Sequence, residues 1–211
     1  MREKKLDKRK VQGTETKKKL YEIAKKMFME RRFSDVNIGD LTDAVGITKG
    51  AFYVHFESKN ALIALLIADY VAQVDKDYKA FVEKLSDNRS SSSVLLALTE
   101  KITDTLSNTL GCENTKKMYE MLLVETAGIQ AVKGYGRELY ALVYSIIEKG
   151  LRSGEFKSTL SPETLSRHFV MAIRGVSYEW CVHYPDFDLK EQAIEHIRLL
   201  IEGICTPIIK Q

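Results

Sequence analysis

The segment Asn37 to Lys59, NIGDLTDAVGITKGAFYVHFESK, constrains the fold of this 211-residue chain more than any other. Asn37 suits a helix N-cap, and Asp40 stands three residues later, where its carboxylate can bond back to the cap. Apolar residues then recur at helical spacing for about two turns until Gly46, which tolerates the left-handed conformation that ends a helix. Thr48 can cap a second helix at once. Residues 37–56 therefore read as a helix-turn-helix, a motif whose second helix enters the major groove of DNA.

The second helix of this motif carries small and polar residues around two aromatic anchors, Phe52 and Phe56. Gly50 and Ala51 would let the helix approach the groove floor closely. We expect its first turn to lie nearest the bases and its later residues, with Lys59, to hold phosphates. The predicted DNA-binding residues are Asn37, Thr48, Lys49, Gly50, Ala51, Tyr53, His55 and Lys59.

This part of the chain resembles the N-terminal pattern of the TetR family of bacterial helix-turn-helix transcriptional regulators. That pattern is an amphipathic helix, a short helix, and a turn with a recognition helix that ends in an aromatic-rich segment followed by Ser-Lys. It is present here as KLYEIAKKMFMERRF, IGDLTDAV and GITKGAFYVHFESK, over about residues 14–70. Arg32 replaces the usual glycine, and Thr42, Val45 and Ala51 also depart from the common residues. The resemblance therefore gives no base preference.

Charge is distributed unevenly along the chain, although the formal net charge is only +3. Residues 1–60 hold 15 Lys or Arg against 9 Asp or Glu, whereas residues 61–211 hold 17 against 20. A Lys-rich segment is by itself most often a solvated tail. Next to a helix-turn-helix, a basic segment also supplies the salt-dependent attraction to phosphate that positions the motif on DNA. We therefore expect residues 1–13 to form a basic, disordered arm.

Helical periodicity continues through the rest of the chain and predicts an all-α fold of about nine helices. The chain has only three prolines and twelve glycines, and it shows no strand-like alternation of useful length. This composition argues against a sheet. A helix predicted over residues 58–85 exceeds the ordinary length, so it should join a DNA-binding domain at 14–60 to a helical domain at 61–211. The polar run at 86–93 is predicted to be a loop. Further helices are predicted at about residues 94–110, 115–127, 135–152, 162–184 and 189–205.

The resemblance implies that the second domain forms a homodimer through its last two long helices and encloses a pocket for a small-molecule effector. Large, soft or amphipathic side chains gather on two of its predicted helices, and such groups suit an adaptable cavity for an apolar or amphipathic molecule. The same residues could equally be plain core, or form buried salt bridges and interhelical hydrogen bonds. The predicted pocket residues are Met118, Tyr119, Leu122, Glu125, Met171, Arg174, Tyr178, Trp180, Cys181 and His183.

Other function classes find little support in the sequence. It has no phosphate-binding glycine loop, HExxH motif or nucleophile elbow, and its four histidines lack a metal-site spacing, so we expect no catalytic residue, metal or cofactor. Three widely separated cysteines without a CxxC pair indicate buried free thiols, with a redox sensor as the alternative. No apolar run is long enough to span a bilayer and the N-terminus does not resemble a secretory signal, so we expect a cytoplasmic protein without a membrane partner.

Taken together, these features predict a transcriptional regulator that binds a palindromic operator in double-stranded DNA as a homodimer. We expect a repressor that is released by its effector. The alternative is a helical protein-interaction module whose basic face contacts RNA or membrane lipid. The recognition helix beside a basic segment favours the first interpretation.

Overall fold

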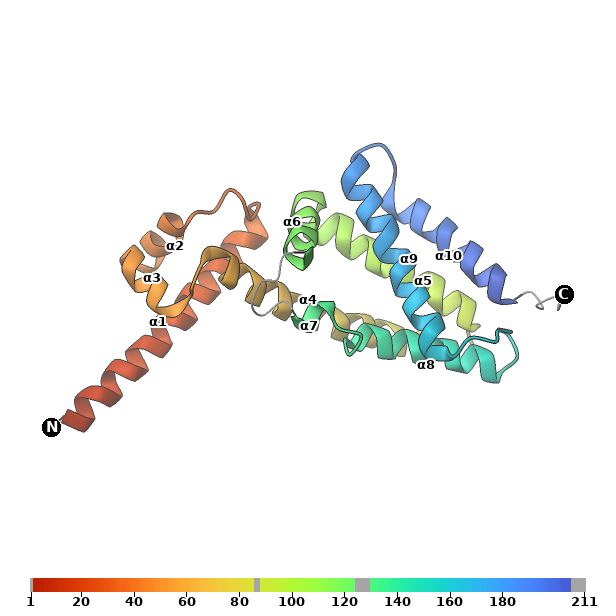
Figure 1. Cartoon of the computed structure of the whole chain (residues 1–211), viewed down its shortest axis with the longest axis horizontal. Helices are drawn as coiled ribbons and strands as arrows, with labels where there is room; N and C mark the ends of the chain where they lie inside the picture. The colour runs from red at the N-terminus through yellow and green to blue at the C-terminus, as the bar shows by residue number, and fades with distance from the viewer. Residues whose placement is uncertain (1, 86–87, 124–129, 206–211) are drawn as a thin grey trace.

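The computed structural model describes residues 2–85, 88–123 and 130–205, and every regular element within those ranges is helical. The all-α prediction is confirmed, with nine α-helices of seven or more residues in the described ranges. The first group of helices is α1 (Arg2–Glu30), α2 (Ile38–Val45), α3 (Lys49–His55) and α4 (Lys59–Glu83). The second group is α5 (Ser91–Asp104), η1 (Thr105–Leu110), α6 (Cys112–Leu123), α7 (Gln130–Lys133), α8 (Glu138–Arg152), α9 (Pro162–His183) and α10 (Leu189–Cys205). Figure 1 shows α4 running from the first group into the second.

The helix-turn-helix forms through the predicted caps. The Asn37 side chain accepts the Asp40 N–H at 3.0 Å and the Asp40 carboxylate accepts the Asn37 N–H at 2.8 Å, which completes a capping box. Gly46 ends α2 with a φ of 76°, and the Thr48 hydroxyl starts α3 by accepting the Ala51 N–H at 3.2 Å. Each of these bonds spans only a few residues, so the local sequence is sufficient to specify the turn.

The first four helices share one hydrophobic cluster. Side chains from α1, the following loop, α2, α3 and α4 are fully buried in it, including Leu20, Val36, Leu41, Phe52 and Leu62. Each such side chain stabilises the fold by roughly 1.5–3 kcal/mol relative to exposure. The cluster continues beyond the helix-turn-helix, because Val71 of α4, Met121 of α6 and Val132 of α7 also belong to it.

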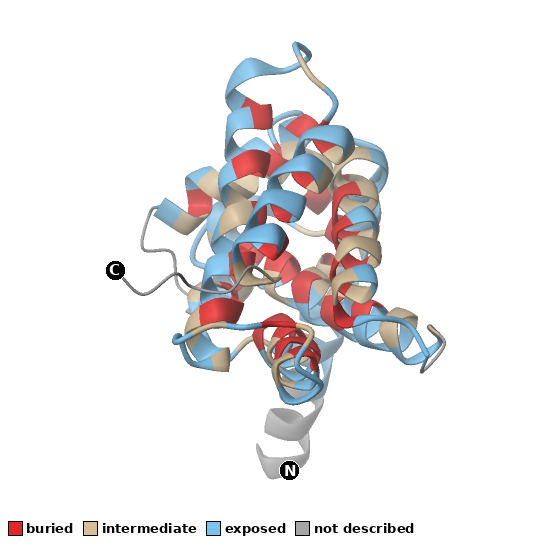
Figure 2. Cartoon of the chain, turned by 90° about the vertical axis from the view of Figure 1, so that its right-hand side faces the viewer, coloured by how far each residue is buried: buried red, intermediate tan, exposed pale blue. Residues whose placement is uncertain are grey.

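A second hydrophobic cluster holds the C-terminal half of α4 together with α5, α8, α9 and α10. Figure 2 shows buried residues gathered on the sides of these helices that face one another. A smaller third cluster, in which Trp180 lies, closes the end where α6 meets α9 and α10. The predicted long helix is confirmed as α4, and it contributes side chains to both main clusters. No described helix is long and apolar enough to cross a bilayer.

The start of the chain differs from the prediction. We expected a disordered arm at residues 1–13, but α1 is continuous from Arg2 to Glu30, and only residue 1 lies outside the described range. Few residues in this segment are apolar, yet Lys, Arg, Glu, Leu and Gln are strong helix formers and no proline interrupts them. Helix propensity therefore lets α1 begin at Arg2, well before Leu20, which is the first residue along the chain to enter the hydrophobic cluster.

The polar run at 86–93 is also not a loop throughout, because α5 begins at Ser91. The Glu155 carboxylate accepts the N–H groups of Ser91 and Ser92, both at 2.8 Å, and the Ser90 hydroxyl accepts the Ser93 N–H at 3.1 Å. These bonds satisfy donors of the first helical turn and place a negative charge at the positive end of the helix dipole. Residues 86 and 87 lie outside the described range.

We predict that Glu155→Gln lowers the free energy of unfolding at pH 7 by about 1–2 kcal/mol, because the variant loses the charge at the start of α5. Partial burial raises the pKa of the Glu155 carboxyl, but the hydrogen bonds from Ser92 and Ser91 outweigh it and hold the pKa below its usual value. A carboxylate with a lowered pKa stabilises the fold above its unfolded pKa of about 4.3 and loses that contribution as the pH falls through its folded pKa.

The free energies of unfolding of wild type and variant, measured in urea, should therefore differ at pH 7 and converge as the pH falls through the folded pKa of Glu155. Glu57→Gln, at an exposed glutamate, is the matched control and should change little at either pH. A stability loss that is the same at all pH values would contradict the role of the charge.

Candidate DNA interface and effector cavity

One face of α3 is buried and the other is exposed. Phe52 is fully buried, and its ring lies 5.4 Å from that of Tyr53 and 5.8 Å from that of Phe56, measured between centroids. Lys49 and Gly50 are exposed, and Tyr53 is 56% exposed. The aromatic anchors thus hold α3 against the cluster while these three residues face the solvent.

The other predicted DNA-binding residues have more constrained positions. Asn37 and Thr48 are exposed, but their side-chain oxygens already cap α2 and α3. Ala51, His55 and Lys59 are half-buried at the edge of the exposed face. The structure therefore brings all eight residues to one end of the molecule, where Lys49, Gly50 and Tyr53 are exposed and are not used as helix caps.

Val54 is the α3 residue that the sequence reasoning missed. Its side chain is 79% exposed, although valine is apolar. It lies four residues after Gly50, so both share one face of the helix. The sequence did contain a signal for this, because burial of Phe52 and Phe56 at helical spacing places residue 54 on the opposite side.

Besides its apolar packing, helix α6 interacts with the first group of helices through polar groups. The Asn114 side chain accepts the Phe33 N–H at 3.4 Å, just before α2. At the start of α4, burial and the positive charge of Lys117 on α6 lower the pKa of the Lys59 ammonium. A displacement of α6 would therefore alter interactions directly beside the helix-turn-helix.

A cavity of about 70 Å³ lies among α4, η1, α6, α8 and α9. Most of its wall is aliphatic, and Met118, Tyr119, Leu122 and Arg174 line it as predicted. Glu125 lies outside the described residues. The polar residues on the wall are Tyr70, Tyr78, Thr105, Tyr119, Arg137, Arg174 and Ser177. Of these seven, Tyr119 and Arg174 were predicted and the other five were not.

Five predicted pocket residues, all on α9, do not line this cavity, and their assignment is corrected: Met171, Tyr178, Trp180, Cys181 and His183. Met171 and Tyr178 are 52% and 48% exposed, and His183 is exposed at the end of the helix. Trp180 and Cys181 are buried in the third cluster. The α9 helix has a cavity side, a core side and an exposed side, and its composition alone does not distinguish them.

Cys112 and Cys181 are both buried in the third cluster. Both are buried free cysteines, as predicted, whereas Cys205 is half-buried. Burial raises the pKa of both thiols, that of Cys181 to about 12. Since the thiolate is the reactive form, this pair is packed core at neutral pH. The described residues contain no group of three or more potential metal ligands.

A buried ion pair joins α4 to α8 beside the cavity. The Arg137 guanidinium donates to the Asp75 carboxylate through Nε at 2.8 Å and Nη2 at 2.6 Å. The Leu139 N–H donates to the same carboxylate at 3.3 Å, so Asp75 also caps the start of α8. Because the Asp75 side chain is only 2% exposed, its charge depends on these partners.

Three tyrosine hydroxyls surround the cavity. The Tyr119 hydroxyl donates to the Arg174 carbonyl at 3.0 Å, and burial raises its pKa to about 12. Burial likewise raises the pKa of Tyr78 and Tyr70. The Tyr70 hydroxyl is buried and has no hydrogen-bond partner within the described part of the chain. All three hydroxyls therefore stay protonated at neutral pH.

The wall contributed by η1 has π-helical geometry. At its end, the Gly111 N–H donates to the carbonyl of Leu106, five residues earlier, at 2.9 Å. Such π turns are rare and often occur at functional sites. Sequence periodicity predicted an uninterrupted helix here, because one wide turn hardly changes the spacing of apolar residues.

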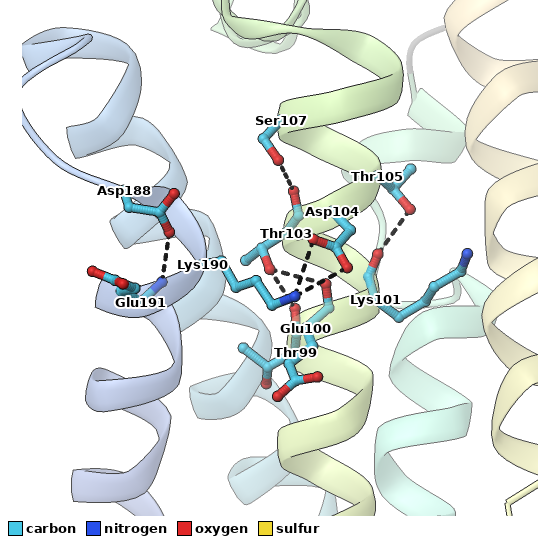
Figure 3. A network of polar contacts seen from close by, with 10 residues as sticks. All are labelled: Thr99, Glu100, Lys101, Thr103, Asp104, Thr105, Ser107, Asp188, Lys190 and Glu191. Carbon is cyan, nitrogen blue, oxygen red and sulfur yellow. Dashed lines mark hydrogen bonds and ion pairs between the residues drawn. The ribbon is translucent and has the colours of Figure 1, made fainter.

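Hydroxyl side chains accompany the transition from α5 to η1 (Figure 3). Thr103, Thr105 and Ser107 each donate to the carbonyl four residues earlier, at 2.8–3.0 Å. This kind of back-bonding bends helices and competes with the regular backbone bonds. Figure 3 also shows Lys190 of α10 paired with Asp104 at 3.3 Å, which fixes the end of α5 from outside.

The chain is similar to known proteins in both sequence and fold. Residues 20–66 match the family described as bacterial regulatory proteins, tetR family. The chain is 21% identical over 188 residues to the HTH-type transcriptional repressor KstR2 of Rhodococcus jostii, covering 89% of this chain and 90% of that protein.

Two solved structures are similar in fold. A TetR-family transcriptional regulator from Pectobacterium atrosepticum has a TM-score of 0.73 at 19% identity, covering 93% of this chain and 97% of that one. The transcriptional regulator FadR from Bacillus subtilis, in complex with stearoyl-CoA, has a TM-score of 0.67 at 16% identity, covering 88% and 98%. At these identities, the likeness establishes the fold.

We predict that Asp75→Leu lowers the free energy of unfolding by about 3–5 kcal/mol, because it leaves the Arg137 guanidinium buried without its partner. The double variant Asp75→Leu with Arg137→Met should lie much closer to wild type, since apolar groups of similar size replace both charges. Urea unfolding of the wild type, the two single variants and the double variant measures the coupling. Additive losses would show that the pair does not act as a unit.

Proposed function

Because this chain is a helix-turn-helix transcriptional regulator of the TetR family, we propose that it binds a palindromic operator in double-stranded DNA as a homodimer and represses transcription until a small molecule enters the cavity. The observation that carries this proposal is that α4 leaves the helix-turn-helix and then lines the cavity with Tyr70, Val71, Val74 and Tyr78. The family points to a regulator rather than an enzyme. We propose that it has no catalytic role and works in the cytoplasm.

DNA recognition is assigned to the exposed face of α3. Lys49 and Tyr53 extend from that face, and Gly50 between them permits close approach to the groove floor. Ala51 borders the same face, and Asn37 and Thr48 cap the starts of α2 and α3. His55 and Lys59 stand at its edge, where phosphates would pass.

The dimer contact is assigned to α9 and α10. Both helices carry large apolar side chains in solvent, including Met171, Tyr178, Leu199 and Leu200. An apolar groove of about 270 Å³ between them is lined by Leu199, Leu200 and Leu160. Exposed apolar surface of this kind is typical of protein interfaces, and a second copy of the chain would cover it.

Control is assigned to a change in the separation of the two recognition helices. Met118 and Leu122 line the cavity and also pack against the cluster of the helix-turn-helix, so a ligand that moves them acts on both. Binding requires half-sites spaced by one DNA turn of about 34 Å or a multiple, so a shift of a few ångströms weakens both contacts. By linkage, an effector that weakens DNA binding by some factor binds the DNA complex more weakly by the same factor.

The proposal is tested by gel shift of the DNA upstream of its own gene against an excess of random duplex. Selection of bound genomic fragments then defines the operator, whose two-fold symmetry and half-site spacing report the dimer. Binding that random duplex competes away completely would refute sequence-specific regulation.

We predict that Lys49→Ala changes the sequence preference, whereas Lys59→Ala weakens binding to all duplexes alike and lowers the slope of log affinity against log salt by roughly one. The reason is that a groove contact discriminates between bases and a phosphate contact does not. Competition gel shifts at several salt concentrations measure both effects. Lys79→Ala, at an exposed lysine on the same helix as Lys59, is the control and should change neither quantity.

We further predict that Val54 reads thymine methyl groups, because it is an exposed apolar side chain beside Gly50 on the groove face. Replacing thymine by deoxyuridine at each operator position removes only the methyl group. One position per half-site should lose affinity about three- to tenfold with the wild type and much less with Val54→Ala, consistent with loss of a small apolar contact. If Val54→Ala remains as sensitive as wild type at every position, another residue makes the contact.

A further inference from the structure

Two polar groups on the cavity wall, the Tyr70 hydroxyl and the Arg174 guanidinium, have unused capacity to donate hydrogen bonds. The Tyr70 hydroxyl is buried and has no partner in the described structure. The Arg174 guanidinium donates to the Val132 carbonyl at 3.3 Å and lies 5.8 Å from the centroid of the Tyr140 ring. A guanidinium has five N–H donors, so these contacts leave most of its capacity unused. A ligand that pairs with Arg174 has to bring acceptors, because a guanidinium can only donate.

The charge on the wall is also one-sided. Arg137 and Arg174 are the cations, and Asp75 neutralises Arg137 through two hydrogen bonds. Arg174 has no carboxylate partner within the described residues, and none of the described residues lining the cavity is an Asp or Glu. Arg174 is half-buried, where an opposite charge is attracted more strongly than in bulk water.

We propose that the effector is a small amphipathic monoanion whose carboxylate is held by Arg174 and whose apolar body fills the space beside Met118 and Leu122. This rests on the proposed function. Arginine binds carboxylates through two parallel hydrogen bonds, a geometry that neutral ligands do not match. The Tyr70 hydroxyl offers a second donor for an oxygen on the ligand.

Binding of this ligand has a structural consequence. The cavity of about 70 Å³ is smaller than the roughly 300–1,000 Å³ of ligand pockets, so the ligand displaces flexible neighbours such as Met118 and Leu122. When Arg174 turns to the carboxylate, it gives up its bond to the Val132 carbonyl. Met118, Leu122 and Val132 all pack in or against the cluster that holds the helix-turn-helix, so entry of the anion disturbs that cluster.

The test uses saturated monocarboxylates of six to fourteen carbons, each compared with the primary amide and the primary amine of the same chain length. Calorimetric titration of the full-length protein without DNA should show at least one chain length at which the carboxylate binds about ten or more times tighter than both the amide and the amine of that length. Arg174→Gln should reduce this preference to less than about threefold, Arg174→Lys should retain part of it, and Tyr70→Phe should weaken the carboxylate two- to fivefold. Melting curves of each variant confirm that it is folded.

Equal or tighter binding of the amides or amines, or no binding at any length, would overturn the proposal. So would a carboxylate preference that survives Arg174→Gln; if that variant does not fold, a preference abolished by Arg174→Lys would count against the role of charge. Gel shifts run in parallel without carboxylate separate the two ideas. If the wild-type protein fails to bind the operator in the absence of carboxylate, the proposed function is refuted. The anion preference is then judged by calorimetry alone.

Discussion

Helix α4 must satisfy two hydrophobic clusters at once, and the remaining architecture follows from this constraint. Its first turns are buried with Leu62 and Ile63 among α1, α2 and α3, and its later turns are buried with Tyr78 against α5 and α8. Twenty-five residues of helix span about 38 Å. The Asp75–Arg137 pair fixes the rotation of α4 about its axis, because a buried carboxylate must face its guanidinium. The orientation of α3 relative to the cavity is thereby set by one continuous element.

Local sequence determined much of what could be foreseen. The capping box at Asn37 and the left-handed Gly46 involve neighbours only, so the helix-turn-helix and its buried anchor Phe52 were predictable. The same was true of the long helix, whose apolar register is continuous. By contrast, the start of α5 depends on Glu155, which is 64 residues away from Ser91, and the capping of α8 depends on Asp75. Residue patterns carry no information about such pairings until the fold brings the partners together.

The cavity residues likewise fall into those that local sequence could indicate and those that depend on distant contacts. Met118 and Leu122 line the cavity, as expected from their spacing on α6, whereas α9 presents apolar or soft side chains on three sides. Periodicity indicates that Trp180 and Met171 lie on different sides of α9, but which side meets the cavity depends on where α4 and α6 pack. Tyr70 and Arg137 escaped notice for the same reason, since each lies on an element that looked purely structural.

The π-helical turn shapes the cavity wall. The Leu106 carbonyl accepts the N–H of Gly111, five residues ahead, whereas in an α-helix it would accept that of Leu110. A ring closed over five residues is wider than one closed over four, so the backbone bulges at this point. Leu106 and Leu110 both line the cavity, so the extra width of this turn decides where their side chains stand on the wall.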